Sequence, residues 1–253
     1  MLQDNLNPQT ETILPYDMVT LPSQGIFYPN KKKSLKVSYL NASDENLLAS
    51  QSLQGTGELV NSLLSKKILD KDIDVLDMPE CDKEAILVFL RNTAFGTEYS
   101  VQLTDPITKE QFSTTIDLSI LKTKDINVEI DVKNEFEFYL EKSKKKVKLT
   151  FLTPADTKEL RELNETHKKD PINPYMTKQL EKMVKEIDGV RERMTISQFI
   201  QTMPITDSQS IRKIVKDNTP TLDLNTTVTS PSNEKMNVGI SLGVEFFRPF
   251  YGV

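Results

Sequence analysis

The sequence predicts an α+β protein that has a sheet-rich region with helices, a helical block, and two β-hairpins without a metal. Three observations support this fold class: one hairpin pattern occurs twice, apolar residues alternate between residues 136 and 151, and apolar residues recur at helical spacing in residues 59–90 and 154–215. We expect four parts: an extended N-terminal arm at residues 1–30, an α+β domain with the first hairpin at residues 31–152, a helical region at residues 153–220, and the second hairpin with an aromatic C-terminal tail at residues 221–253.

The repeated pattern has the same spacing between its apolar residues in both copies. Thr104-Asp105-Pro106 precedes Phe112, Ile116 and Leu118, and Thr229-Ser230-Pro231 precedes Met236, Ile240 and Leu242. A zinc ribbon has this outline, but structural zinc needs four Cys or His ligands. The chain has one cysteine, Cys81, and one histidine, His167, and neither lies in a copy. The hairpins are therefore expected to be zinc-ribbon-like without a metal, and no metal or cofactor site is predicted.

The composition excludes several classes of protein. A charged fraction of 27% and a mean hydropathy of −0.41 are typical of a soluble protein, and the longest apolar run, residues 85–90, is too short to span a bilayer. The net charge of −5 argues against a broad surface for nucleic acid. A lone cysteine fits a reducing compartment, and the first residues do not have the pattern of a signal peptide. We expect neither a membrane nor a nucleic acid as partner.

The N-terminal arm contains Pro22, Pro29 and Gly25, which disfavour a central strand and permit a turn. Its apolar residues Ile26, Phe27 and Tyr28 are candidate anchors. Two alternatives remain open here: the arm packs on its own domain, or it reaches a neighbouring subunit.

Helix signals follow the arm. Asn41 and Asp44 form a capping-box pattern that starts a helix, which is expected to run toward Leu53 and stop at Gly55 and Gly57. Two further helices are expected before Gly96, the second of them capped by Asp82.

The alternation in residues 136–140 and 147–151 is the strongest hairpin signal. The turn between them contains Lys144, Lys145 and Lys146, which either form a solvated turn or contact phosphate. Thr153 and Asp156 then form a second capping-box pattern with Pro154 at the first helical position. A later helix is expected to include Met176, Val184 and Ile187 and to stop at Gly189.

No catalytic constellation emerges from the sequence. Cys81 and His167 would form an enzyme site only if the fold brought them together, and no glycine-rich phosphate loop is present. The C-terminal aromatic residues, Phe246, Phe247, Phe250 and Tyr251, either fill the protein's own core or dock into another subunit, as aromatic anchors do at interfaces.

Several segments resemble the T4-type bacteriophage baseplate hub and hub assembly protein family. They are the arm at residues 21–29, Asp44-Glu45-Asn46-Leu47-Leu48 with Ser50-Gln51-Ser52-Leu53, Met203-Pro204-Ile205-Thr206-Asp207-Ser208, and Leu242-Gly243-Val244-Glu245-Phe246-Phe247-Arg248-Pro249. Members often carry Cys-Pro-x-Cys at the ribbon turns, so the family's metal is not carried over to this chain.

The resemblance implies a non-enzymatic baseplate hub protein of a contractile-tailed phage, assembled in host cytoplasm and located in the virion baseplate. It would dock to other baseplate or hub proteins, and no oligomeric state is predicted. Candidate partner-binding residues are Ile26, Phe27, Tyr28, Phe246, Phe247, Arg248, Phe250 and Tyr251. Deleting residues 244–253 is expected to abolish incorporation and leave a folded chain. The alternatives are a transient hub assembly chaperone absent from the mature virion and a nucleic-acid-binding regulator.

Overall fold

The computed structural model describes residues 14–49 and 58–247 and has the predicted α+β composition. The strands within these ranges are β1 (Tyr16–Thr20), β2 (Ser34–Ser38), β3 (Glu98–Thr104), β4 (Gln111–Asp117), β5 (Glu135–Leu140), β6 (Lys145–Thr150), β7 (Val184–Ile187), β8 (Asn225–Thr229) and β9 (Lys235–Gly239). The helices are α1 (Ala42–Leu48), α2 (Glu58–Lys67), α3 (Glu80–Phe95), α4 (Pro154–Thr166), α5 (Tyr175–Met183), α6 (Arg193–Thr202) and α7 (Ile205–Asn218), with short 3₁₀ helices η2 (Val75–Asp77), η3 (Leu118–Ile120) and η4 (Val244–Phe247).

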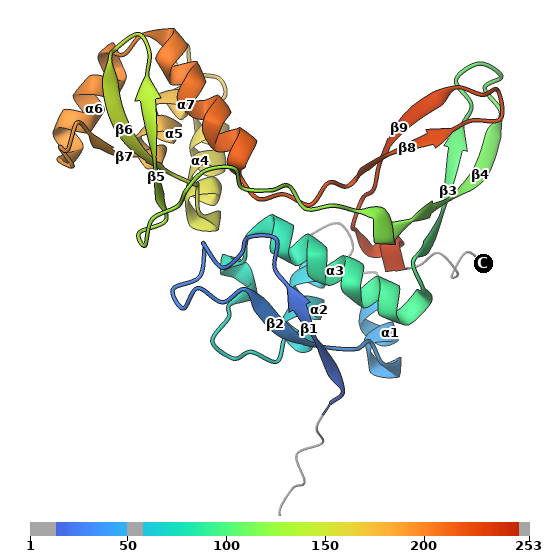
Figure 1. Ribbon diagram of the computed structural model, residues 1–253. Helices are drawn as coiled ribbons and strands as arrows, with labels where there is room; N and C mark the ends of the chain where they lie inside the picture. The colour runs from blue at the N-terminus through green and yellow to red at the C-terminus, as the bar shows by residue number, and fades with distance from the viewer. Residues whose placement is uncertain (1–13, 50–57, 248–253) are drawn as a thin grey trace, which may run out of the picture.

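The strands form small antiparallel sheets, ordered β1-β2, β3-β4, β5-β6-β7 and β8-β9. Figure 1 shows a V-shaped molecule, with β5–β7 and α4–α7 in one arm, the hairpins β3-β4 and β8-β9 in the other, and α3 near the base. Both repeated copies are hairpins, as the sequence predicts, while their likeness to a zinc ribbon stays a prediction.

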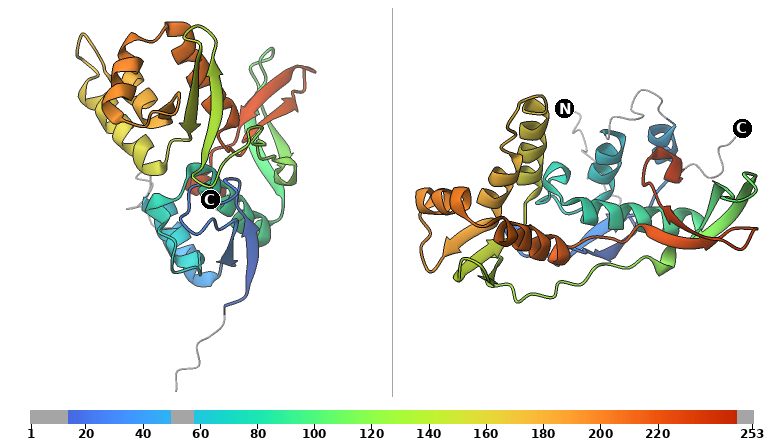
Figure 2. Two further views of the ribbon diagram at one scale, coloured as in Figure 1. Left: turned by 60° about the vertical axis from the view of Figure 1, so that its left-hand side comes forward. Right: turned by 90° about the horizontal axis from the view of Figure 1, so that it is seen from above.

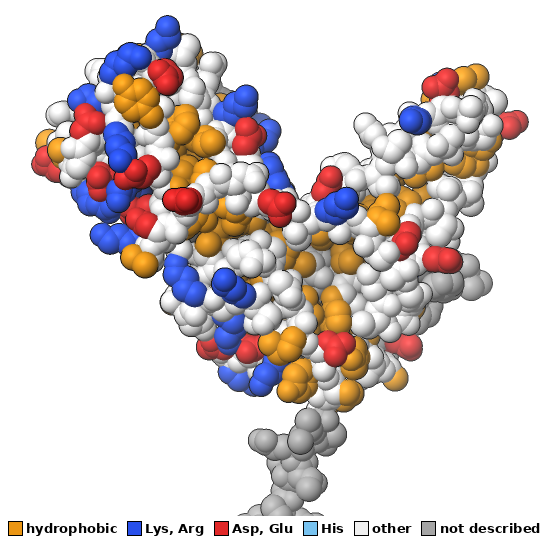
Figure 3. Space-filling model, in the orientation of Figure 1, with side chains coloured by type: hydrophobic (Ala, Val, Ile, Leu, Met, Phe, Trp, Pro, Cys, Tyr) orange, Lys and Arg blue, Asp and Glu red, His pale blue; other side chains and the backbone are white. Residues whose placement is uncertain are grey.

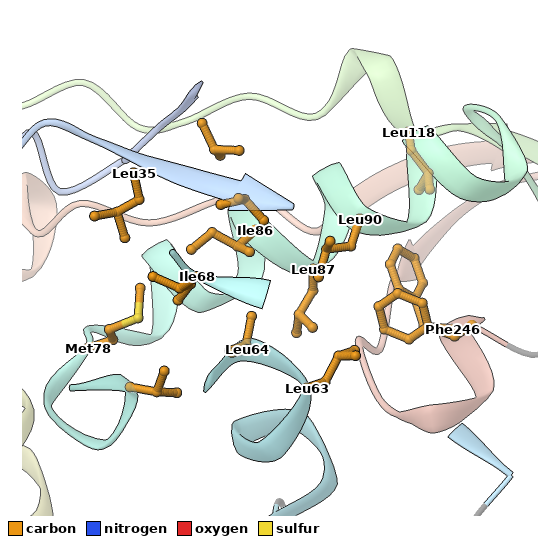
Figure 4. Packing of buried hydrophobic residues seen from close by; sticks show 14 of the residues in the cluster. Leu35, Leu63, Leu64, Ile68, Met78, Ile86, Leu87, Leu90, Leu118 and Phe246 are labelled. Atoms are coloured by element: carbon orange, nitrogen blue, oxygen red, sulfur yellow. The ribbon is translucent and has the colours of Figure 1, made fainter. Parts of the chain in front are cut away.

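The buried side chains form two clusters, and each defines a lobe. The first lobe comprises β1, β2, α1–α3, both hairpins and η4, and the second comprises β5–β7 and α4–α7. In the first lobe Ile86, Leu87 and Leu90 of α3 face Leu63 and Leu64 of α2 (Figure 4). Burying such side chains contributes roughly 1.5–3 kcal/mol each. The expected division of the chain into four parts remains a prediction. The packing groups β5 and β6 with the helices that follow them, whereas the expected division places residues 135–150 with the first hairpin.

Both predicted capping boxes are present. At α1 the Asn41 side chain accepts from the Ser43 N–H at 3.0 Å, and Asp44 accepts from the Asn41 N–H at 2.9 Å. At α4, Thr153 and Asp156 make the reciprocal bonds, with Pro154 at the start. The first helix is shorter than expected: α1 ends at Leu48, and the predicted stop at Gly55 and Gly57 lies outside the described residues.

One helix prediction is wrong. Helix α5 ends at Met183, and Val184 and Ile187 belong to strand β7, paired with Leu149 and Val147 of β6. Val184 and Ile187 recur at a spacing that suits a helix, but β6 offers them backbone partners and burial. The pairing with β6 therefore outweighs the local helical pattern.

Two connecting segments, residues 118–134 and residues 219–224, link the lobes. They run antiparallel to one another, with a bridge between Thr123 and Leu222 and backbone bonds from Lys124 to Thr221 (2.9 Å) and from Asp223 to Lys122 (2.8 Å). Figure 1 shows the pair crossing from one arm of the V to the other. In the part of the chain that the structure describes, every helix is too short or too polar to cross a bilayer.

Candidate functional site

The segment at residues 21–31 joins the two lobes, and we call it the interlobe clamp. Its first attachment is Asp82 on α3, which is fully buried. Asp82 accepts hydrogen bonds from the Ser23 N–H (2.9 Å), the Ser23 Oγ (2.6 Å) and the Tyr28 hydroxyl (2.8 Å). Burial raises the pKa of Asp82 and outweighs these bonds, which lower it, and burial beside Asp82 also raises the pKa of Tyr28.

The predicted capping role of Asp82 is wrong. Helix α3 begins at Glu80 after Pro79, so Asp82 is the third residue of the helix. The Asp82 side chain does not cap the helix and instead accepts hydrogen bonds from the clamp. The same start occurs in the second lobe, where α7 begins after Pro204 and Asp207 is the third residue. Asp207 accepts from the N–H groups of Lys142 (3.1 Å) and Ser143 (2.7 Å) and from the Ser143 Oγ (2.5 Å).

The sequence carries a signal for this relationship that capping patterns and apolar spacing do not reveal. Residues 78–82 and 203–207 both read Met-Pro-x-x-Asp. In each lobe the motif places a buried carboxylate at a helix start, where a serine-containing turn from elsewhere in the chain binds it. The shared motif thus marks one bracing contact per lobe.

The clamp is folded into successive turns, which corrects the expected extended arm. Backbone bonds run from Gln24 to Leu21 (3.0 Å), from Tyr28 to Gly25 (3.2 Å) and from Lys31 to Tyr28 (3.0 Å). Gly25 has a φ of +83°, and a Cβ added there would lie 2.5 Å from the Lys31 carbonyl oxygen. The turn therefore requires glycine at this position.

The second attachment of the clamp is in the second lobe. Ile26 and Phe27 are half-buried and pack on the second core cluster. The Asn134 side chain donates to the Ile26 carbonyl at 2.6 Å and accepts from the Lys31 ammonium. Ile26, Phe27 and Tyr28 thus pack within their own chain, which agrees with the first of the two alternatives stated for the arm, while their role in binding a partner stays a prediction.

The C-terminal aromatic residues Phe246 and Phe247 also lie in the chain's own core, with 0% and 1% exposure. The Phe246 ring lies 5.2 Å from the Tyr99 ring and 5.4 Å from the Phe247 ring, measured between centroids. The buried Arg91 guanidinium lies 5.8 Å from the Phe246 ring and donates to the Glu98 carbonyl at 2.9 Å.

The burial of Phe246 and Phe247 argues against the expectation that a chain lacking residues 244–253 stays folded, because that deletion removes two core aromatic residues. The remaining predicted partner residues, Arg248, Phe250 and Tyr251, lie outside the described residues.

The two hairpins are tied together at their turns. Asp105 in the β3-β4 turn is 1% exposed and accepts from the Ile107 N–H (2.8 Å) and the Thr108 N–H (3.1 Å). It also accepts from the Ser232 N–H (3.0 Å) and Oγ (2.7 Å) in the β8-β9 turn. Burial raises the pKa of Asp105, but the hydrogen bonds from Ser232, Thr108 and Ile107 outweigh it and hold the pKa well below its ordinary value.

The predicted likeness of the hairpins to zinc ribbons would place a metal at these turns. The donor atoms at this junction are one carboxylate and the hydroxyls of Ser230 and Ser232, which lie 2.9 Å apart, and structural zinc prefers thiolates and imidazoles. Within residues 14–49 and 58–247, no three His, Cys, Asp or Glu side chains are grouped as a metal site. The residues present suit a hydrogen-bonded junction between the hairpins.

The outer faces of this hairpin pair carry mostly uncharged polar side chains. Along each strand the half-buried apolar residues alternate with exposed ones. The exposed uncharged residues are Ser100, Gln102, Thr104, Gln111, Ser113, Thr115, Asn225, Thr227, Thr229 and Asn237. Figure 3 shows few charged side chains on the hairpin pair and many on the second lobe. The same alternation is present in the sequence, where it predicts strands and also marks this uncharged face.

The structure keeps Cys81 and His167 apart. Cys81 is buried in α3 of the first lobe, with its sulfur 3.7 Å from an Asp82 oxygen, and burial and Asp82 raise its thiol pKa. His167 follows α4 in the second lobe and pairs with Asp170 at 2.7 Å. A Cys–His enzyme site requires the two side chains to be in contact, and here they lie in different lobes.

The lysine run at residues 144–146 is neutralised by neighbouring carboxylates. Lys144 lies 3.4 Å from Glu141, Lys145 lies 2.6 Å from Asp188, and Lys146 lies 2.6 Å from Glu137. Such pairs reduce the field that would attract a phosphate backbone, so the turn gives little support to a nucleic-acid-binding function.

These features define a two-lobed α+β protein in which buried carboxylates brace the fold and a hairpin pair projects from the body. The family described as T4 bacteriophage base plate protein matches residues 21–248, and the chain belongs to this family. The match begins at the clamp and ends just after η4, so it includes both lobes apart from strand β1. Searches of curated proteins and of solved structures gave no match. The chain is thus a bacteriophage baseplate protein, as the sequence resemblance implied, and the family implies contacts with other baseplate proteins.

Proposed function

We propose that the chain is a non-catalytic structural protein of the baseplate hub that docks to other baseplate proteins during assembly of a contractile tail. Assembly would take place in host cytoplasm, and the chain would remain in the virion. Family membership supports the baseplate role, and the hairpin pair is the observation that carries the docking role.

The outer faces of the hairpin pair suit an interface for two physical reasons. Uncharged side chains lose less hydration free energy than charged ones when a partner covers them, and charged residues are depleted at the centres of interfaces. Each hairpin is a two-stranded sheet with one unpaired edge per strand, to which a partner strand can add. Ile107, 61% exposed in the β3-β4 turn, supplies an apolar anchor.

A charge scan with a matched control tests this proposal. Gln102→Glu with Gln111→Glu places two charges on the outer face of β3-β4, where the two side chains share a hydrogen bond of 3.2 Å. Gln198→Glu with Gln209→Glu adds the same charge on exposed positions of α6 and α7. With both proteins shown to be folded by circular dichroism, we expect the hairpin variant alone to lose incorporation into purified baseplates. Equal incorporation of the two variants would contradict the docking role.

A transient assembly chaperone remains the second candidate, since such a protein would use the same contacts. Protein analysis of purified virions separates the two functions. The proposed function requires the chain at a constant ratio to other baseplate proteins in the particle. A chain found in assembly intermediates but absent from virions would favour the chaperone.

A further inference from the structure

A cavity of about 540 Å³ lies between the lobes, where the clamp, the segment before α3 and the start of α4 meet. We call it the interlobe pocket. Phe27 and Pro29 of the clamp, Ile73, and Pro154 of α4 give it an apolar lining. Its volume is within the usual range for pockets that enclose a ligand group. It lies outside the hairpin pair, and its lining includes Tyr28, whose hydroxyl bonds to Asp82.

The charged residues that line the pocket are all acidic. Its lining includes Asp72, Asp74 and Asp77 and has no lysine or arginine. Lys32 neutralises part of this charge by pairing with Asp72 at 2.7 Å. Asp74 accepts the Leu76 N–H at 2.9 Å and is exposed, as is Asp77. The pocket therefore favours an apolar or aromatic group next to a cation.

The chain itself ends in a segment with this chemistry. The six residues after Phe247 are Arg248-Pro249-Phe250-Tyr251-Gly252-Val253, a cation followed by two aromatic residues. A sequence with an arginine and two aromatic rings matches a pocket with apolar walls and an acidic rim.

The position of η4 separates this segment from the pocket of its own chain. Phe246 packs at Arg91, near the C-terminal end of α3, and the clamp is held at Asp82, near the N-terminal end. These two α3 residues are about 13 Å apart along the helix axis, and the pocket lies on the clamp side. The backbone of residues 248–251 spans at most about 14 Å, which is about the length of α3 between these two residues and leaves little to reach past the clamp into the pocket. Figures 1 and 2 show η4 and the clamp near opposite ends of α3.

We propose that the interlobe pocket binds the C-terminal segment, residues 248–253, of a second copy of this chain. The rings of Phe250 and Tyr251 occupy the apolar part, and Arg248 pairs with Asp74 and Asp77 at the rim. Reciprocal insertion produces a closed two-fold dimer in which each copy fills the pocket of the other. This proposal does not depend on the baseplate role, since it concerns contacts between copies of one chain.

Sedimentation velocity of the full-length chain tests the proposal. We expect association that depends on concentration, and a dissociation constant raised roughly ten-fold or more by Asp77→Arg or by Arg248→Asp, because each change places like charges together. Asp217→Arg reverses an exposed charge on α7, away from the pocket, and should leave the dissociation constant unchanged. Thermal unfolding of each variant checks that the fold is intact.

Mixing the two charge-reversed variants identifies the source of the bound segment. A pocket with Asp77→Arg accepts a segment with Arg248→Asp from the other variant, so the mixture should associate when neither variant does alone. A wild-type chain that stays monomeric at all concentrations would overturn the proposal. So would association that Asp77→Arg and Arg248→Asp leave unchanged, because the interface would then lie elsewhere.

Discussion

Asp82 and Ser23, 59 residues apart, are joined by two hydrogen bonds that use both the backbone and the side chain of the serine. The N–H of Ser23 lies 2.9 Å from one Asp82 oxygen, and its Oγ lies 2.6 Å from the other. In the second lobe the N–H and the Oγ of Ser143 also bond to one aspartate, Asp207, at 2.7 and 2.5 Å, but both bonds go to the same oxygen, and the other oxygen accepts from the Lys142 N–H. Each lobe thus uses a helix-start carboxylate to fix a turn against its core.

Replacing Asp82 tests how much the clamp contributes to stability. Asp82→Ala leaves the buried Ser23 and Tyr28 donors unpaired, and we expect the free energy of unfolding to fall by about 3–5 kcal/mol. Asp82→Asn keeps an acceptor for Ser23 and avoids a buried charge, so it should cost less than half as much. Urea denaturation measures both. A loss below about 1 kcal/mol for Asp82→Ala would mean that the clamp is held by apolar packing alone.

Gly25→Ala tests the close approach inside the clamp, and Gly96→Ala is its control. Both glycines have a positive φ, +83° and +82°, but only Gly25 would bring a Cβ near another atom, the Lys31 oxygen at 2.5 Å. We expect Gly96→Ala to cost about 1–3 kcal/mol from backbone strain, because its φ of 82° and ψ of 172° lie in a region that is essentially restricted to glycine. Gly25→Ala should cost at least about 2 kcal/mol more, since the backbone of Lys31 must move. Equal losses in thermal unfolding would show that the turn relaxes freely.

The junction between the hairpins is tested by hydrogen exchange. Asp105→Ala removes the acceptor of the Ser232 N–H, and we expect that amide to exchange roughly ten-fold faster. Asp117→Ala is the matched control, because Asp117 caps η3 through the Ser119 N–H at 2.9 Å, away from the turns. Exchange in the β8-β9 turn should respond to the first change and not to the second. If the Ser232 amide exchanges at the same rate in both variants, the hairpins are joined by their apolar faces alone.

Local signals made part of this fold predictable. The capping boxes at Asn41 and Thr153 and the hairpins around Asp105 and Ser230 depend on residues close together in the chain. Sequence spacing is sufficient for such features, because the atoms involved are within one turn of helix or one hairpin.

The roles of Asp82 and Asp207 could not be predicted from residues close to them in the sequence. Each residue stands at a helix start, where capping is the usual function of aspartate, and each binds a turn 59 to 65 residues away. The strand conformation of Val184 and Ile187 could not be predicted locally either, because it depends on pairing with β6. The burial of Phe246 against Tyr99 likewise depends on where the C-terminal segment returns to the first hairpin. Such long-range contacts leave no periodic pattern in the sequence.

The last prediction concerns pH. Burial, and then the neighbouring charge of Glu80, raise the pKa of Glu84 on α3 to about 7 from 4.5. A carboxyl group whose pKa is higher in the folded state binds its proton more tightly there. It therefore contributes stability that is fully present below about pH 4.5 and is lost as the pH rises through about 7.

Glu84→Gln removes this dependence, because glutamine stays neutral. Glu84 is partly exposed and screened by solvent, so we expect the variant to be more stable than the wild type by only about 1 kcal/mol at about pH 8, and equal to it at about pH 4.5. Urea denaturation at both pH values measures the difference. Glu80→Gln serves as a partial control, since it removes the smaller of the two causes and should give a smaller effect in the same direction. If wild type and Glu84→Gln differ by the same amount at both pH values, the side chain is ionised throughout and α3 tolerates its charge.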